Sequence, residues 1–151
     1  MSELTVSELS LLLRHAGRRV LLIEDNPLNR EVTGLLLSKV GLKVDAAKDG
    51  QTAMDLAASQ TYDLIITDLA MPGLDGVETG QRIRALPGYA NTPIIALSAC
   101  VFGEDRDYCL SGGLNDFIAK PVTATRLYET VLRWLDDPAP GFQAALQGAS
   151  A

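Results

Sequence analysis

The chain has 151 residues, of which 47% are hydrophobic and 21% are charged, and its formal net charge is −6. Its length predicts one domain, and its hydrophobic fraction excludes a mostly disordered chain. The acidic balance argues against binding to nucleic acid or to an anionic membrane, because both need clustered Lys and Arg. We find no signal peptide and no apolar run near the ~20 residues that span a bilayer, so we expect a cytoplasmic protein without direct membrane contact.

Short apolar runs alternate with helical patterns through the middle of the chain. Residues 20–23 are typical of a buried strand. Asn26 and Pro27 then supply a helix N-cap and a first-turn proline. The apolar positions that follow recur at helical spacing and predict the buried side of this helix: Leu28, Val32, Leu35, Leu36 and Val40.

The same alternation continues to about residue 136. We expect further strands at 42–46, 64–67, 94–97 and 116–119, and further helices at 50–59, 77–86, 104–111 and after Thr123. The last helix has an apolar stripe of Leu127, Val131, Trp134 and Leu135. Five strand–helix units with short loops predict an α/β doubly wound fold, in which helices cover both faces of a parallel sheet.

Both ends of the chain differ in composition from this region. Residues 1–17 hold one or two turns of helical pattern and predict an N-terminal linker. Residues 137–151 are rich in Pro, Ala, Gly and Ser and predict a flexible C-terminal tail. The domain itself is expected at residues 18–136.

Polar residues stand where four of the five predicted strands end. Glu24 and Asp25 follow the first strand, Asp68 ends the third, Ser98 ends the fourth and Lys120 follows the fifth. Because ligands of open α/β sheets bind outside the carboxyl ends of the strands, we expect these side chains to converge.

This set of side chains favours one chemistry. Carboxylates that lie close together repel one another, and a hard divalent cation such as Mg²⁺ removes that cost. Lys120 and Ser98 would complement a phosphoryl group with a positive charge and a hydroxyl donor. Asp68 is the natural nucleophile, because carboxylates can form aspartyl phosphates. The cluster therefore predicts phosphoryl transfer to Asp68.

Several segments agree in order and spacing with one family. They lie within about residues 19–135, at 22–26 (LIEDN), 63–68 (DLIITD), 71–76 (MPGLDG), 96–99 (ALSA) and 120–121 (KP). Together they resemble the receiver domain of two-component response regulators. The resemblance implies a flavodoxin-like (βα)5 fold with the strand order 2-1-3-4-5.

The resemblance also implies the roles of the acidic residues. Asp68 would be the phosphoacceptor. Asp25 would be a direct ligand of Mg²⁺ or Mn²⁺, Glu24 would hold the metal through water, and the backbone carbonyl of Ala70 would be a further ligand.

Other positions match the family in the same way. Ser98 would contact a phosphoryl oxygen, and Lys120 would pair with Asp68 or its phosphate. Pro121 would follow a cis peptide bond. Phe117 stands at the position of the family's mobile aromatic residue, where tyrosine is frequent, and it lacks the hydroxyl that an output through a phenol hydrogen bond would need.

The implied function is a phosphorelay. A histidine kinase or a histidine phosphotransfer domain would donate the phosphoryl group. The change would then spread to the face formed by the helix at 104–111, the strand at 116–119 and the last helix. Residues 26–31 (NPLNRE) are most similar to receivers of hybrid histidine kinases. The chain would be a monomer or weak dimer, and a phosphoacceptor that assists its own phosphorylation and dephosphorylation rather than an enzyme.

Three other functions fit the sequence less well. A receiver-like protein-interaction module without phosphorylation is disfavoured by the intact Asp25, Asp68 and Lys120. A phosphatase with an aspartyl nucleophile would carry a second aspartate where this chain has Ala70. A flavin mononucleotide carrier needs a phosphate-binding loop after the first strand, and the charge of Glu24 and Asp25 would repel that phosphate.

Overall fold

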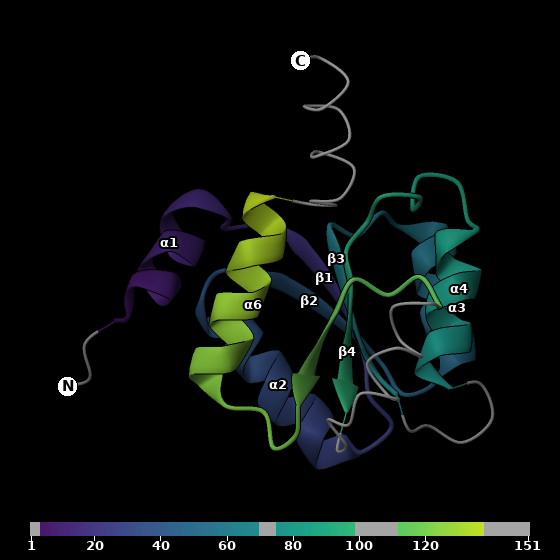
Figure 1. Cartoon of the computed structure of the whole chain (residues 1–151), viewed down its shortest axis with the longest axis horizontal. Helices are drawn as coiled ribbons and strands as arrows, with labels where there is room; N and C mark the ends of the chain where they lie inside the picture. Colours follow the sequence, from purple (N-terminus) through teal and green to yellow (C-terminus); the bar gives the residue numbers. More distant parts are fainter. Residues whose placement is uncertain (1–3, 70–74, 99–111, 138–151) are drawn as a thin grey trace.

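The computed structural model describes residues 4–69, 75–98 and 112–137. In this part of the chain, five strands form one parallel sheet in the order β2-β1-β3-β4-β5 (Figure 1). The strands are β1 (Arg19–Ile23), β2 (Lys43–Ala47), β3 (Leu64–Asp68), β4 (Ile94–Ser98) and β5 (Asp116–Ala119). The helices are α1 (Val6–Arg14), α2 (Pro27–Lys39), α3 (Gly50–Ser59), α4 (Gly76–Arg84) and α6 (Ala124–Asp136). The predicted fold and strand order are confirmed.

Helices cover both faces of the sheet, as the apolar strands require. α2 and α6 pack on one face, and α3 and α4 pack on the other (Figure 1). β3 and β4 are buried along their whole length, because each of their two sides faces a layer of helices. The stripe predicted for the last helix is buried in α6 at Leu127, Val131, Trp134 and Leu135.

Helix α2 begins as predicted but buries a different side. The Asn26 side chain accepts a hydrogen bond from the backbone N–H of Asn29, and Pro27 opens the helix. Its buried residues are Thr33 and Leu37. The predicted stripe is corrected here, because three of its members are exposed: Leu28 by 69%, Val32 by 47% and Leu35 by 64%. The apolar residues of this helix lie on more than one side, since Leu28, Val32 and Leu35 are exposed while Leu37 is buried, so spacing alone does not select the side that faces the sheet.

A nine-residue helix, α1, forms within residues 1–17, which we expected to be a linker with one or two turns of helical pattern. Its Leu11 is fully buried in a cluster with α6 residues. Polar contacts also join the end of α1 to α6: Arg14 contacts Asp136 Oδ2 at 2.9 Å, and His15 contacts Asp136 Oδ1 at 2.6 Å. Residues 6–14 of the segment expected as a linker thus form a helix that packs on α6. The cause is tertiary, because contact with α6 stabilises a helix too short to persist alone.

Two other expectations fall on residues beyond the described ranges. They are the helix expected at 104–111 and, apart from Asp137, the tail expected at 137–151. Across the described residues, every helix is too short or too polar to cross a membrane.

Candidate functional site

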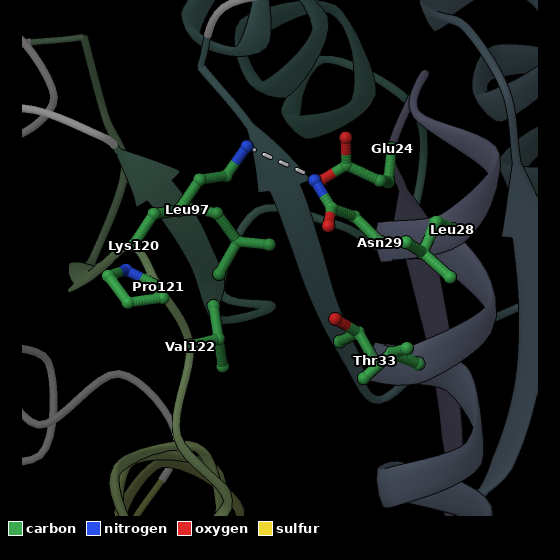
Figure 2. Close-up of a pocket in the computed structure, with 9 residues that line it drawn as sticks. Glu24, Leu28, Asn29, Thr33, Leu97, Lys120, Pro121 and Val122 are labelled. Carbon is green, nitrogen blue, oxygen red and sulfur yellow. Dashed lines mark ion pairs between the residues drawn. The ribbon is translucent and has the colours of Figure 1, made fainter.

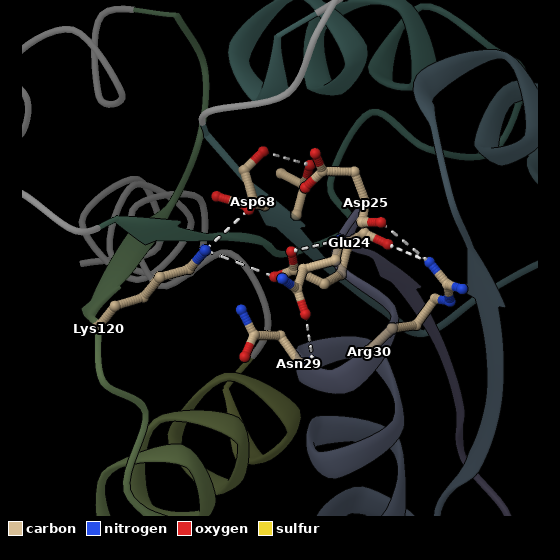
Figure 3. Close-up of polar contacts among 8 residues, drawn as sticks. Glu24, Asp25, Asn29, Arg30, Asp68 and Lys120 are labelled. Atoms are coloured by element: carbon tan, nitrogen blue, oxygen red, sulfur yellow. Dashed lines mark hydrogen bonds and ion pairs between the residues drawn. The ribbon is translucent and has the colours of Figure 1, made fainter.

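The residues at the strand ends meet at one edge of the sheet. Glu24 and Asp25 directly follow β1, Asp68 is the last residue of β3, and Lys120 directly follows β5. The parallel register aligns these ends (Figure 3). One carboxylate oxygen from each of Glu24, Asp25 and Asp68 lies within 4.8 Å of the others. The predicted convergence of these three acids is observed.

Lys120 supplies the positive charge of the site. Its Nζ donates a hydrogen bond to Asp68 Oδ2 at 2.8 Å and lies 3.5 Å from Glu24 Oε2. Its backbone N–H donates to the carbonyl of Ser98 at 2.7 Å, which ties the end of β5 to the end of β4. Burial alone would lower the pKa of Lys120, but the bond to Asp68 and the charges of Asp68 and Glu24 raise it above its ordinary value.

Glu24 is the most deeply buried acid of the three, with 1% of its surface exposed. Its Oε1 accepts a hydrogen bond from the Asn26 N–H at 3.2 Å. Its Oε2 is buried and accepts no hydrogen bond from the described residues, although the Lys120 ammonium is close. Burial, together with the neighbouring Asp68 carboxylate, raises the pKa of Glu24 to about 7.

These residues suit a hard divalent cation. Three carboxylates and one lysine leave excess negative charge in a half-buried site, and within the described part of the chain no donor bonds Oε2 of Glu24. Mg²⁺ prefers oxygen ligands of this kind and needs only one or two carboxylates. The fourth predicted ligand, the carbonyl of Ala70, lies outside the described residues.

The remaining predicted positions lie in or directly after β4 and β5. Ser98 is buried with 6% exposure and ends β4, one residue beyond the Leu97 that pairs with Asp68. Phe117 is half-buried in β5 and packs against the core cluster on the α3 and α4 side. The Lys120–Pro121 peptide bond is cis, as predicted.

A groove adjoins the site between α2 and the segment after β5 (Figure 2). Its volume is about 490 Å³. The groove is lined by Glu24, Leu28, Asn29, Val32, Thr33, Leu97, Lys120, Pro121 and Val122. The ion pair of Lys120 and Glu24 closes one end, and the exposed Leu28 and Val32 lie on the wall formed by α2. The groove was not predicted, because it depends on which side of α2 turns away from the sheet.

Arg30 is a second unpredicted feature. Its Nη1 donates to the backbone carbonyl of Glu24 at 2.9 Å and reaches that of Asp25 at 3.4 Å (Figure 3). The motif at residues 26–31 contains this arginine, but nothing in the spacing indicates that its side chain turns back to the end of β1.

Residues 20–132 match the family model of the response regulator receiver domain. Among curated proteins, the chain is 34% identical over 129 residues to the sensor protein GacS of Pseudomonas syringae pv. syringae, covering 81% of this chain and 14% of that protein. It is 33% identical over 115 residues to the signal transduction histidine-protein kinase BarA of Escherichia coli K12, covering 76% of this chain and 12% of that protein. The chain thus spans only a small part of these relatives.

Solved structures agree with this match. The receiver domain of the sensor histidine kinase PA1611 from Pseudomonas aeruginosa PAO1 has a TM-score of 0.75 and 39% identity, covering 81% of this chain and all of that one. That structure holds a magnesium ion in its active site cleft. The chemotaxis protein CheY4 of Vibrio cholerae has a TM-score of 0.76 and 29% identity, covering 78% of this chain and 98% of that one.

Proposed function

The chain belongs to the response regulator receiver domain family of two-component signalling, and from that premise we propose that Asp68 accepts a phosphoryl group from a phosphohistidine. The observation that carries the proposal is the 2.8 Å contact between Lys120 Nζ and Asp68 Oδ2, inside a cluster of three carboxylates. A carboxylate at this position can act as nucleophile, while the lysine offsets the charge of the incoming phosphoryl group.

The transfer balances as a single displacement. A carboxylate oxygen of Asp68 forms a P–O bond as the P–N bond to the donor imidazole breaks. The imidazole nitrogen keeps the electron pair and takes up a proton from solvent. Lys120 stays protonated throughout, because its neighbours raise its pKa. The Ser98 hydroxyl is proposed to donate to a phosphoryl oxygen.

Glu24, Asp25 and Asp68, with the carbonyl of Ala70, are proposed to hold Mg²⁺ or Mn²⁺. Bound there, the cation would neutralise charge on the phosphoryl oxygens and on the crowded carboxylates. The fit of the donor set supports this assignment, as does the magnesium ion in the cleft of the P. aeruginosa PA1611 receiver.

The phosphohistidine is proposed to arrive on a helix that docks along α2. Leu28, Val32 and Leu35 are exposed and spaced four and three residues apart, so they form one apolar stripe on this helix. The groove beside the stripe ends at Lys120 and Glu24, next to Asp68. A helix that lays an apolar face on this stripe would bring its histidine to the acidic site.

The names of the relatives indicate which class of protein would exchange phosphoryl groups with this chain. GacS and BarA carry the names of a sensor protein and a histidine-protein kinase, so a relay partner is a histidine kinase or a histidine phosphotransfer domain. Phosphorylation is proposed to act through Ser98 and Phe117 on the face that includes residues 104–111, β5 and α6. We also propose a cytoplasmic location and a monomer or weak dimer.

Incubation with acetyl phosphate and Mg²⁺ tests the proposal. Intact-mass spectrometry should show one added phosphoryl group on the wild type, lost on treatment with hydroxylamine, which cleaves acyl phosphates. Asp68→Asn should gain none. Asp55→Asn, which removes an exposed carboxylate on α3, is the matched control and should behave as wild type. An unmodified wild type, with acetyl phosphate or with a phosphorylated histidine domain, would instead favour a receiver-like interaction module that does not use phosphate.

A further inference from the structure

Arg30 reaches back from the second turn of α2 to the turn that carries two of the acidic residues. Its Nη1 bonds the carbonyl oxygen of Glu24 at 2.9 Å and approaches that of Asp25 at 3.4 Å. The Arg30 backbone N–H also bonds the Asn26 carbonyl at 2.9 Å, so the arginine is held within a regular helix. One half-buried guanidinium therefore joins α2 to both peptide units of the acidic turn.

The turn is fixed from its other side as well. The Glu24 N–H donates to the carbonyl of Ala47 in β2 at 3.0 Å, and the Asn26 N–H donates to the Glu24 carboxylate at 3.2 Å. Arg30 adds the contact to the carbonyl of Asp25. Because peptide planes are rigid, fixing both carbonyls also fixes the direction in which the two side chains leave the backbone.

We propose that Arg30 is a positioning residue for the divalent cation, holding the Glu24–Asp25 turn so that both carboxylates reach the ion shared with Asp68. This inference rests on the proposed function, since it assumes that the acidic cluster binds the cation. Arg30 touches the backbone of the ligand residues, so it acts through them. Groups that orient metal ligands in this way commonly change metal affinity by about 10-fold to 100-fold when removed.

Charge and geometry make opposite predictions for the loss of Arg30, which makes the inference testable. A guanidinium near the site repels a divalent cation, so its removal should tighten binding if charge alone mattered. If Arg30 instead orders the turn, its removal should weaken binding, because the carboxylates must then be ordered when the ion arrives. The sign of the change in affinity separates the two roles.

The experiment titrates the full chain with Mn²⁺ and follows the free-ion signal by electron paramagnetic resonance. Arg30→Met is expected to bind Mn²⁺ about tenfold more weakly than wild type. Arg30→Lys keeps the charge but lacks the planar fork, and is expected to fall between the two. Arg82→Met removes an exposed arginine on α4 and is the matched control, expected to bind as wild type does.

The outcomes separate this inference from the proposed function. Failure of wild type to bind Mn²⁺ would overturn the metal site itself. If wild type binds and Arg30→Met binds equally or more tightly, the positioning role is wrong while the metal site stands. Trp134, the single tryptophan, reports by fluorescence whether each variant is folded. Should Arg30→Met unfold, Arg30→Gln is measured instead, with the same tenfold weakening expected.

Discussion

Gly76 lies directly against the backbone of Asp68. A Cβ built on Gly76 would come within 2.4 Å of the Asp68 carbonyl oxygen and 3.0 Å of its carbonyl carbon. The first residue of α4 is therefore packed against the last residue of β3, which carries the proposed phosphoacceptor. No L-residue with a side chain fits at this position without moving the backbone on which Asp68 stands.

Gly76→Ala is therefore expected to lower the free energy of unfolding by about 1–3 kcal/mol, as overpacked sites do. Urea unfolding followed by Trp134 fluorescence measures this. Gly34→Ala is the matched control, because its nearest neighbour is a leucine methyl at 4.0 Å. In the middle of α2, that change should stabilise the protein by about 0.5–1 kcal/mol. Equal effects at the two glycines would contradict the packing argument.

The strands were predictable because a strand that is buried on both faces has a continuous apolar sequence. Ile94, Ile95, Ala96 and Leu97 are buried on both faces, and a short continuous apolar run is typical of such a strand. The position of the site could also be predicted, because the carboxyl ends of parallel strands lie at the same edge of the sheet. Asp68 and Lys120 are 52 residues apart, yet their contact follows once the strand order is known.

The helices were harder to predict because their burial depends on partners. Leu28 and Leu37 are both apolar residues of α2, but one is 69% exposed and the other fully buried. Leu11 is buried in a cluster that includes residues of α6, and no pattern within residues 1–17 indicates that neighbour. The Arg30 contact and the groove are unpredictable for the same reason, since each depends on how a helix is rotated about its axis.

The docking of α1 gives a second prediction. Leu11→Ala should cost about 2–4 kcal/mol, because Leu11 is fully buried against α6 and its removal leaves a cavity. Leu13→Ala, in the same helix, removes a side chain that is 76% exposed and should change stability by less than about 0.5 kcal/mol. Urea unfolding of both variants measures the contrast. If the two were equally stable, α1 would not be part of the fold.

Glu24 gives a pH prediction for the metal-free protein. Its pKa rises from 4.5 to about 7 on folding, so between these values the folded state binds more protons than the unfolded state. Stability contributed by the protonated form is therefore complete below pH 4.5 and is lost as the pH rises through about 7. Glu24→Gln keeps an uncharged side chain, so its stability relative to wild type should increase from pH 5 to pH 8.

Urea unfolding in a chelating buffer at the two pH values measures this difference. Asp55→Asn, at an exposed position on α3, should show no such trend. Mg²⁺ at a concentration that saturates wild type should reduce the advantage of Glu24→Gln at pH 8, because the variant keeps only the carboxylates of Asp25 and Asp68 and binds the ion more weakly. If the difference in free energy of unfolding between Glu24→Gln and wild type did not change with pH, the raised pKa of Glu24 would be contradicted.

The next prediction concerns the loss of the positive charge of Lys120 rather than of a carboxylate. Lys120→Met should destabilise the metal-free protein at pH 7 by about 2 kcal/mol, because it leaves the buried carboxylates of Asp68 and Glu24 without their cation. Added Mg²⁺ should therefore stabilise Lys120→Met more than wild type, as the ion replaces the lost charge. Thermal melts with and without Mg²⁺ measure both effects. An equal response of the two proteins to Mg²⁺ would mean that Lys120 does not share its charge with the metal ligands.

Changes in the exposed stripe on α2 should affect transfer from a phosphorylated protein domain but not from acetyl phosphate. Leu28→Ser should slow transfer from a phosphorylated histidine domain by about tenfold, because the leucine is 69% exposed and would be buried by the partner. It should leave transfer from acetyl phosphate unchanged, since that donor needs only the acidic site. Leu13→Ser on α1, at 76% exposure, is the control and should affect neither rate. Rates come from stopped reactions analysed by intact mass. A variant that slowed both donors equally would place Leu28 in the chemistry rather than in docking, and one that slowed neither would put the partner on another face.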